Sequence, residues 1–426
     1  MKKIYLLPIF LFISVFAIAQ QTEQCASMYL LGQQMQDPEV AARIEMTRAV
    51  AAKWRAEHTI DSRSTAPVIT IPVVVHVLYK NATQNISDQQ IYSQLAIMNQ
   101  DYRRLNPDTI NTPSMFDTIA ADIGVEFCLA TLDPQGNPTN GITRTSTSGG
   151  QLFGYFSPIF EDAKYDSLGG KDAWPANQYL NIWVCEMIPG LLGYAQFPGG
   201  VAATDGVVIS YQSFGNIGTV AAPSTEGRTT VHEVGHWLGL YHIWGDDQDC
   251  SGSDSIPDTP NADQASSSDC QVNRNSCSNE DPYWGIFDPN DMVQNYMDYS
   301  HDSCMNMFTL GQKARMYSFL YTDSMRLALF TSPAGCNGVG LQPVASFGQF
   351  FSIYPNPSSG IFNVTYYGNS NPDMTIDVYD VTGKVVKRFT TTEYMYTLDL
   401  SDLVRGVYTL KFTSASETTN KKVIIQ

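Results

Sequence analysis

Three of the six histidines in the 426-residue chain lie within eleven residues, in the stretch HEVGHWLGLYH, and this stretch constrains the fold most. On a helix, His232 and His236 are one turn apart, so both imidazoles leave the same face. Two nitrogens at that separation can hold one divalent ion. Gly239, three residues later, allows the chain to turn sharply out of the helix, which brings His242 back as a third ligand. The spacing therefore predicts a helix that ends at a glycine turn and carries a three-histidine metal site.

The residue types in this stretch also indicate a reaction. Three neutral imidazoles leave a zinc ion its full charge and one open position, and such an ion lowers the pKa of a water molecule to about 7. Glu233, about 100° around the helix from His232, would lie at the cavity rim and accept the proton of that water as it attacks a carbonyl. A lone histidine on an apolar strand, such as His76 in VVVHVLY, is interpreted instead as a core residue. We therefore expect a zinc hydrolase.

The N-terminal sequence MKKIYLLPIFLFISVFAIAQQ indicates export. Two lysines, a short apolar run and a small-residue cleavage site predict a signal peptide over residues 1–19. No other run is long and apolar enough to cross a membrane, so no transmembrane anchor is expected. The net charge of −17 disfavours nucleic acid as a partner and suits a protein that binds cations.

Cysteines of an exported chain are expected to form disulfides. Four of them fall in one loop-rich region, and their spacing leaves all three connectivities open: Cys250, Cys270, Cys277 and Cys304. Cys128 and Cys185 lie in apolar, strand-like runs and are predicted to be buried thiols. The sequence gives no assignment for Cys336.

The order of predicted elements divides the chain. Residues 20–62 are polar, with a helix around 38–58. A strand (68–79), a capped helix (87–106), strands within 124–132, 179–187, 191–197 and 205–211, and the histidine helix then predict an α/β sandwich with a mostly parallel sheet. A long irregular segment (245–305) precedes a helix that begins at Thr309 and runs to about Tyr321. We therefore expect a signal peptide (1–19), a propeptide (20–62), a catalytic domain (63–340) and a β-sandwich (341–426).

The motif HExxHxxGxxH resembles that of the metzincin metallopeptidases, and NYMDY (295–299) resembles their Met-containing turn. The wider sequence, GRTTVHEVGHWLGLYHIWGD, DSIPDTP and NYMDYSHDSCMNMFT, is similar to the pappalysin family, specifically its ulilysin-like branch, over roughly residues 67–335. The resemblance implies a metzincin-like α/β (α+β) catalytic domain. It places Met297 beneath the metal ligands without binding the ion.

The resemblance also implies a substrate site. Tyr299 would turn its phenol toward the oxyanion, although a packed core tyrosine is the alternative. Strand 191–197 would receive substrate as an antiparallel strand through Gly193, Tyr194 and Ala195, unless it is an ordinary sheet strand. Asp302 would favour Arg or Lys after the scissile bond. The alternative is that the pocket acid of the family corresponds to Ser303, in which case the preference for basic residues would relax.

Three structural features follow from the same resemblance. The disulfides would be Cys250–Cys277 and Cys270–Cys304. The stretch DCSGSDSIPDTP would bind a structural calcium ion through Asp254 and Thr259, and a solvated acidic loop is the alternative. Cys25 would occupy the open position on zinc in a latent zymogen, or else be a spare thiol. With a basic preference, the enzyme would cut its own precursor between Ser62 and Arg63.

The C-terminal segments YPNPSSGIFNV, DVTGKVV, LVRGVYTLKF and KKVIIQ are similar to a type IX secretion sorting domain. That resemblance implies export of the folded protein across the outer membrane of a Gram-negative bacterium, to the medium or the cell surface. A substrate-binding β-sandwich is the alternative.

The leading prediction is a secreted zinc endopeptidase acting on protein or peptide substrates, monomeric once mature. A surface adhesion or binding protein with a structural metal is disfavoured, because structural zinc sites usually have four protein ligands. A zinc hydrolase for a small non-peptide substrate is the third alternative.

Overall fold

The computed structural model describes residues 24–58, 68–147, 153, 161–222, 224–266, 270–278, 283–284, 288–336, 351–366, 374–393, 395–414 and 418–426. The expected signal peptide and the expected Ser62–Arg63 cleavage site lie outside these residues. None of the helices in the described ranges has the length and apolar character to cross a membrane.

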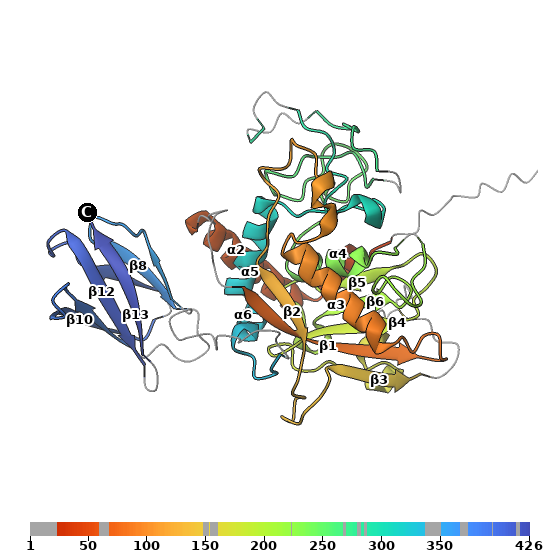
Figure 1. Ribbon diagram of the computed structural model, residues 1–426, viewed down its shortest axis with the longest axis horizontal. Coiled ribbons are helices and arrows are strands. Elements are labelled where there is room, and N and C mark those ends of the chain that lie inside the picture. The colour runs from red at the N-terminus through yellow and green to blue at the C-terminus, as the bar shows by residue number, and fades with distance from the viewer. Residues whose placement is uncertain are drawn as a thin grey trace, which may run out of the picture.

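A twisted six-stranded sheet forms the centre of the first unit (Figure 1). Its strands are β1 (Ile69–Tyr79), β2 (Val125–Leu129), β3 (Ile142–Ser146), β4 (Leu180–Cys185), β5 (Gly193–Ala195) and β6 (Val207–Ser210). The order is β2-β1-β4-β6-β5, with β3 also on β1, and every pairing is parallel except β5 with β6. β-Branched residues fill β1, which is buried almost throughout, as expected for a parallel strand covered on both faces. The predicted mostly parallel sheet is confirmed.

Several helices surround this sheet, and two of them, Asp88–Tyr102 and Arg228–Trp237, pack directly against its strands. The main ones are α3 (Asp88–Tyr102), α4 (Arg228–Trp237), α5 (Leu310–Thr322) and α6 (Ser324–Ala328). Short 3₁₀ turns are η1 (Pro107–Asn111), η2 (Asp162–Lys164), η3 (Asp166–Leu168), η4 (Ala202–Thr204), η5 (Asp302–Cys304) and η6 (Leu329–Thr331). Thr309 and Gln312 form the capping box predicted for α5. His76 on β1 is fully buried against Trp183, as predicted for a core histidine.

The N-terminal segment is docked on this unit rather than loose. It comprises α1 (Ser27–Gln34) and α2 (Pro38–Glu57), the second of which coincides with the predicted helix. Helix α2 packs along α5, where the Trp54 ring stacks on Tyr321 at 5.6 Å. Ile44 is fully buried, whereas Met46 and Val50 on the opposite face are exposed.

Three disulfides brace the unit. Cys250–Cys277 and Cys270–Cys304 lie in the irregular segment, and their pairing agrees with the one that the family resemblance implied. The prediction of a buried thiol at Cys128 is wrong, because Cys128 is bonded to Cys336. A bridge between Ala130 and Cys336 brings the end of the catalytic unit beside β2. Cys185 is free and buried, as predicted.

The C-terminal residues form a separate β unit with its own apolar core (Figure 1). One sheet has the order β10-β9-β12-β13 and the other β11-β8-β7, all pairings being antiparallel. The strands are β7 (Phe351–Tyr354), β8 (Ile361–Tyr366), β9 (Met374–Tyr379), β10 (Val385–Thr391), β11 (Met395–Asp399), β12 (Gly406–Thr413) and β13 (Thr418–Ile425). The all-β C-terminal module is confirmed.

Candidate active site

Helix α4 begins and ends at positions that fix the orientation of its histidines. At its start, the Asp302 carboxylate accepts hydrogen bonds from the backbone N–H groups of Glu226 (2.9 Å) and Arg228 (3.3 Å), so a distant loop caps the helix. At its end, Gly239 has φ of +93°, and its N–H donates to the carbonyl of His236. The predicted glycine turn is therefore present.

The three histidines converge on one point. Their Nε2 atoms are separated by 3.0 Å (His232–His236), 3.1 Å (His236–His242) and 3.2 Å (His232–His242). Two nitrogens bound to tetrahedral zinc at about 2.0–2.1 Å lie about 3.3–3.4 Å apart, so the donor set fits that ion closely.

The remaining ring nitrogens fix the tautomers of these histidines. The Nδ1 atom of His232 lies 2.8 Å from the carbonyl of Tyr296, that of His236 lies 2.8 Å from the carbonyl of Leu240, and that of His242 lies 2.5 Å from Asp246. Since carbonyls accept only, Nδ1 of His232 and His236 must carry the proton, and their Nε2 lone pairs face the shared point. Burial also lowers the pKa of His232 to about 3, which favours the neutral ring.

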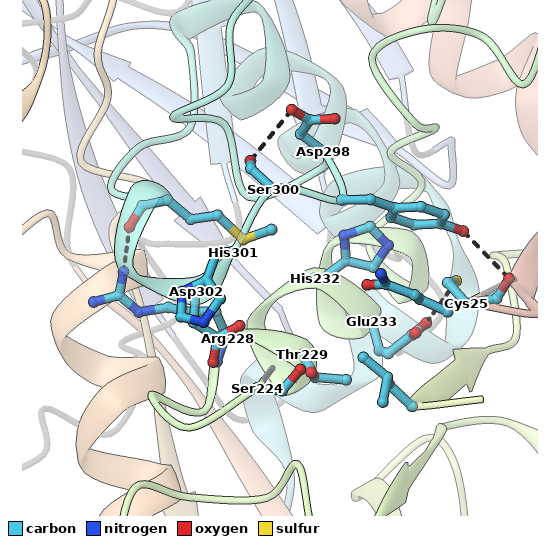
Figure 2. Close-up of a pocket in the computed structure, with 14 residues that line it drawn as sticks. Cys25, Ser224, Arg228, Thr229, His232, Glu233, Asp298, Ser300, His301 and Asp302 are labelled. Atoms are coloured by element: carbon cyan, nitrogen blue, oxygen red, sulfur yellow. Dashed lines mark hydrogen bonds between the residues drawn. The ribbon is translucent and has the colours of Figure 1, made fainter. Parts of the chain in front are cut away.

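Glu233 lies in the same pocket, fully buried (Figure 2). Its Oε2 accepts a hydrogen bond from the Ser27 hydroxyl at 2.7 Å, and the Cys25 thiol lies 3.4 Å away. Its Oε1 is buried without a hydrogen-bond partner among the described residues. Burial raises the pKa of Glu233 to about 8, an effect that the two hydrogen bonds reduce. A carboxyl in this state is suited to exchanging a proton near neutral pH.

Cys25 completes a four-residue cluster with the histidines. One donor atom from each of Cys25, His232, His236 and His242 lies within 4.8 Å of all the others. Burial and the nearby charge of Glu233 raise the pKa of the Cys25 thiol well above its ordinary value. A thiolate at this position therefore needs a cation beside it. The arrangement fits the zinc ligation expected of a latent form.

Met297 and Tyr299 lie where the Met-turn resemblance expected them. A Cβ added to Gly235 would collide with the Met297 sulfur, so this methionine packs directly beneath α4. The Tyr299 ring lies 4.9 Å from that of His242, and its hydroxyl donates to the Cys25 carbonyl at 3.3 Å. Tyr299 therefore packs against the core and also touches the N-terminal segment that occupies the site.

The outer edge of β5 is paired with the N-terminal segment. The Gly193 carbonyl accepts from the Ala26 N–H at 3.1 Å, and the Leu192 N–H donates to the Gln24 carbonyl at 2.8 Å. The Ala195 N–H donates to the Ser27 hydroxyl at 2.8 Å. The bridge between Cys25 and Gly193 is parallel. Tyr194 pairs with Val208 of β6, and its side chain is buried beside Lys164.

The same pocket extends beside α4, and this part of it, the side pocket, is lined by Ser224, Arg228, Thr229, His301, Asp302 and Met305 (Figure 2). Arg228 forms ion pairs with Asp101 (2.9 Å) and Asp108 (3.1 Å). Asp101 and Asp108 thus balance the guanidinium of Arg228, whereas Asp302 lines the pocket itself. Burial raises the pKa of Asp302, which opposes its negative charge. Ser303, the alternative match to the pocket acid of the family, carries no charge and does not line this pocket.

The expected calcium loop contains a buried carboxylate with one unused oxygen. Asp254 Oδ1 accepts from the Thr259 hydroxyl (2.7 Å) and the Ile256 N–H (2.9 Å). Asp254 Oδ2 is buried without a hydrogen-bond partner among the described residues. Burial raises the pKa of Asp254 to about 7. An isolated buried carboxylate is costly unless a cation or a proton satisfies it, so this donor set fits a hard cation.

Several contributors to the site were not predicted from the sequence. Ser27 bridges Glu233 and β5, and Asp246 orients His242. Asp246 follows His242 by four residues, in HIWGD. Because a carboxylate often orients a metal-binding histidine, this spacing could have predicted the contact. The contacts of Ser27 could not be predicted from the sequence, because they form only when the N-terminal segment docks against β5 and Glu233.

Two family models match the chain. Residues 164–321 match pregnancy-associated plasma protein-A, and residues 352–426 match a secretion system C-terminal sorting domain. The chain is 33% identical over 288 residues to an extracellular metalloprotease of Colletotrichum graminicola, covering 65% of this chain and 85% of that protein. It is 32% identical over 322 residues to an extracellular metalloprotease of Pyricularia oryzae, covering 72% and 91%.

Solved structures agree with these sequence matches. Mature mirolysin of Tannerella forsythia, in complex with a cleaved peptide, is 49% identical, with a TM-score of 0.55 over 62% of this chain and 95% of that one. A promirolysin mutant from the same organism is 42% identical, with a TM-score of 0.62 over 74% of this chain and all of that one. The metzincin-like fold is confirmed, and the comparisons favour a peptidase over the adhesion alternative. The chain belongs to the pregnancy-associated plasma protein-A (pappalysin) family, and it is a secreted zinc metalloendopeptidase with a C-terminal sorting domain.

Proposed function

We propose that His232, His236 and His242 hold the zinc ion and that Glu233 is the general base for peptide-bond hydrolysis. The observation that carries this assignment is the convergence of three Nε2 atoms within 3.2 Å of one another, beside the unpartnered Oε1 of Glu233. When bound there, zinc supplies a Lewis acid that makes a water molecule acidic near neutral pH.

The remaining roles belong to residues of the chain. Glu233 accepts the proton of the attacking water and later delivers a proton to the leaving amine. Tyr299, whose hydroxyl already donates to a backbone carbonyl in the cleft, donates a hydrogen bond to the oxyanion that forms during attack. Met297 packs under α4, beneath the proposed metal ligands.

Substrate binds along β5 as an antiparallel strand, through the backbone of Gly193, Tyr194 and Ala195. The residue after the scissile bond enters the side pocket, where Asp302 favours Arg or Lys. The position of Asp302 on the pocket wall, with the guanidinium of Arg228 already paired to Asp101 and Asp108, supports this preference. An incoming guanidinium can pair bidentately with a carboxylate, which makes Arg the better fit.

The precursor is latent because Cys25 occupies the open zinc position. The segment also takes the β5 hydrogen bonds that substrate needs, and it does so in the parallel direction, opposite to the one proposed for substrate. Ser27 adds a second block by holding Oε2 of Glu233. We propose that residues 20–62 form this propeptide and that the enzyme cuts between Ser62 and Arg63 to remove it.

The domain limits and surroundings complete the proposal. Residues 1–19 direct export, residues 63–340 form the monomeric catalytic domain, and residues 341–426 engage the type IX machinery of a Gram-negative cell before release or surface attachment. A structural calcium ion binds at Asp254 and Thr259, which the unused Oδ2 of Asp254 supports.

The test separates metal binding from catalysis. Glu233→Ala should keep about one zinc per chain but lose several orders of magnitude in kcat on a denatured protein substrate, since the base is gone. His242→Ala should lower the zinc content itself. Zinc is measured by atomic emission and cleavage by mass spectrometry of a peptide mixture. Near-normal turnover by the Glu233 variant would refute the assigned base.

A further inference from the structure

An apolar strip next to the metal site is filled by the N-terminal segment. Phe197 and Tyr241 form it, with ring centroids 5.4 Å apart. Side chains of α1, α2 and their connection cover both rings: Met28, Leu31, Met35, Val40 and Ile44. Phe197 is only 3% exposed in this arrangement. If residues 20–62 leave the mature enzyme, both aromatic rings lose this cover.

The strip lies beside the proposed metal site rather than on a remote surface. The Phe197 ring lies 5.3 Å from that of His236, one of the proposed zinc ligands. Phe197 also follows β5 by two residues, so it continues the strand along which substrate is proposed to pair. Arg315 packs over the Tyr241 ring at 4.2 Å and holds it in place.

Chain direction decides which part of a substrate reaches this strip. Substrate antiparallel to β5 has its N-terminal side at the C-terminal end of β5, where Phe197 lies. Gly193, opposite Cys25, marks the metal end of the strand. Phe197 follows Gly193 by four positions, which span about 13 Å in an extended chain. A substrate side chain about three or four residues before the scissile bond therefore falls on the aromatic rings.

We propose that Phe197 and Tyr241 form a specificity site for a large apolar side chain three or four residues before the scissile bond. The inference rests on the proposed binding of substrate along β5. The N-terminal segment demonstrates the chemistry that the strip accepts, because leucine, methionine and isoleucine side chains fill it in the latent form. The same rings thus serve first as a docking site for the propeptide and then as a substrate contact.

The experiment compares matched peptides on the mature enzyme. Each peptide has Arg after the scissile bond, and the pairs differ only by Leu or Asn at the third or the fourth position before it. Burying a leucine on aromatic rings is expected to raise kcat/KM by about tenfold in at least one pair. Phe197→Ala should bring the ratio of kcat/KM for the Leu peptide to that for the Asn peptide close to one. The conservative Phe197→Leu should retain part of this preference. Ile110→Ala, which alters an exposed apolar residue outside the strip, should keep the wild-type ratio.

The outcomes are separable. A wild-type enzyme that cleaves all peptides without preferring Leu at either position overturns the specificity site and leaves the proposed function intact. A Phe197→Ala enzyme that binds zinc normally and keeps the full ratio also overturns it. A wild-type enzyme that cleaves none of the peptides removes the proposed function, and the specificity site falls with it. The wild-type comparison needs no variant, so the test stands even if Phe197→Ala does not fold.

Discussion

Asp254→Asn should remove a proposed calcium site from the catalytic unit. It should also remove the pH-dependent free-energy cost of burying a charged carboxylate there. The native carboxylate is 1% exposed, and its Oδ2 has no hydrogen-bond partner among the described residues. Asparagine keeps the shape and can still accept the hydrogen bonds of Thr259 and Ile256 through its amide oxygen. It cannot supply the charge that calcium requires.

The pKa of Asp254 sets the size and sign of the effect. Burial raises that pKa from 3.8 to about 7, which corresponds to a penalty on the order of 4 kcal/mol for the charged form. The penalty is absent below about pH 4, grows as pH rises, and is complete above about pH 7. Calcium binds the charged form and relieves the penalty above pH 7, whereas at pH 5 it must first displace a proton. At about 2–4 °C per kcal/mol, calcium should raise Tm by up to about 16 °C at pH 8 and by much less at pH 5.

The assay is thermal unfolding of the precursor carrying Glu233→Ala, which prevents self-cleavage. Protein saturated with zinc and freed of calcium is melted at pH 5 and pH 8, with and without calcium, and with magnesium as the ion control. Asp249→Asn is the matched variant, because Asp249 is exposed in the same loop. An Asp254→Asn protein that keeps the full calcium gain at pH 8, or a native chain with no gain, would refute this reasoning.

Three further predictions concern latency, specificity and processing. Cys25→Ala in the uncleaved precursor should raise peptidase activity about tenfold or more, equivalent to at least about 1.4 kcal/mol of lost inhibition. The buried free thiol variant Cys185→Ala should leave latency unchanged, and equal latency in both variants would assign inhibition to steric cover alone. Asp302→Ala should lose the preference for Arg over neutral residues by about tenfold or more in kcat/KM. N-terminal sequencing should find the matured chain beginning at Arg63, and that cut should be missing from Glu233→Ala; the same cut in the inactive variant would point to another protease.

The histidine site was accessible from the sequence because its geometry is local. Helical periodicity alone places His232 and His236 on one face, and a glycine at position 239 is enough to predict the turn that returns His242. Capping residues predicted the start of α5 for the same reason, since Thr309 and Gln312 are three residues apart. Such features depend on neighbours along the chain.

Features that depend on distant partners were missed. The Cys128–Cys336 bond joins residues 208 apart in the sequence, and an apolar strand around Cys128 gave no hint of a partner. Strand β3, ITRTS, was not predicted, because its side chains are mostly half-buried and its apolar pattern is weak. The hydrogen bond between Ser27 and Glu233 spans 206 residues and exists only because α1 docks on β5.

The disulfide between Cys270 and Cys304 makes the structure of the cleft wall depend on the compartment in which the chain resides. Cys304 closes the same short turn that begins with Asp302, the residue that caps the active-site helix and lines the side pocket. Thiols stay reduced in the cytosol, so a chain awaiting export lacks this tie and the Cys250–Cys277 tie beside it. The bonds that brace this wall of the cleft therefore form only after export.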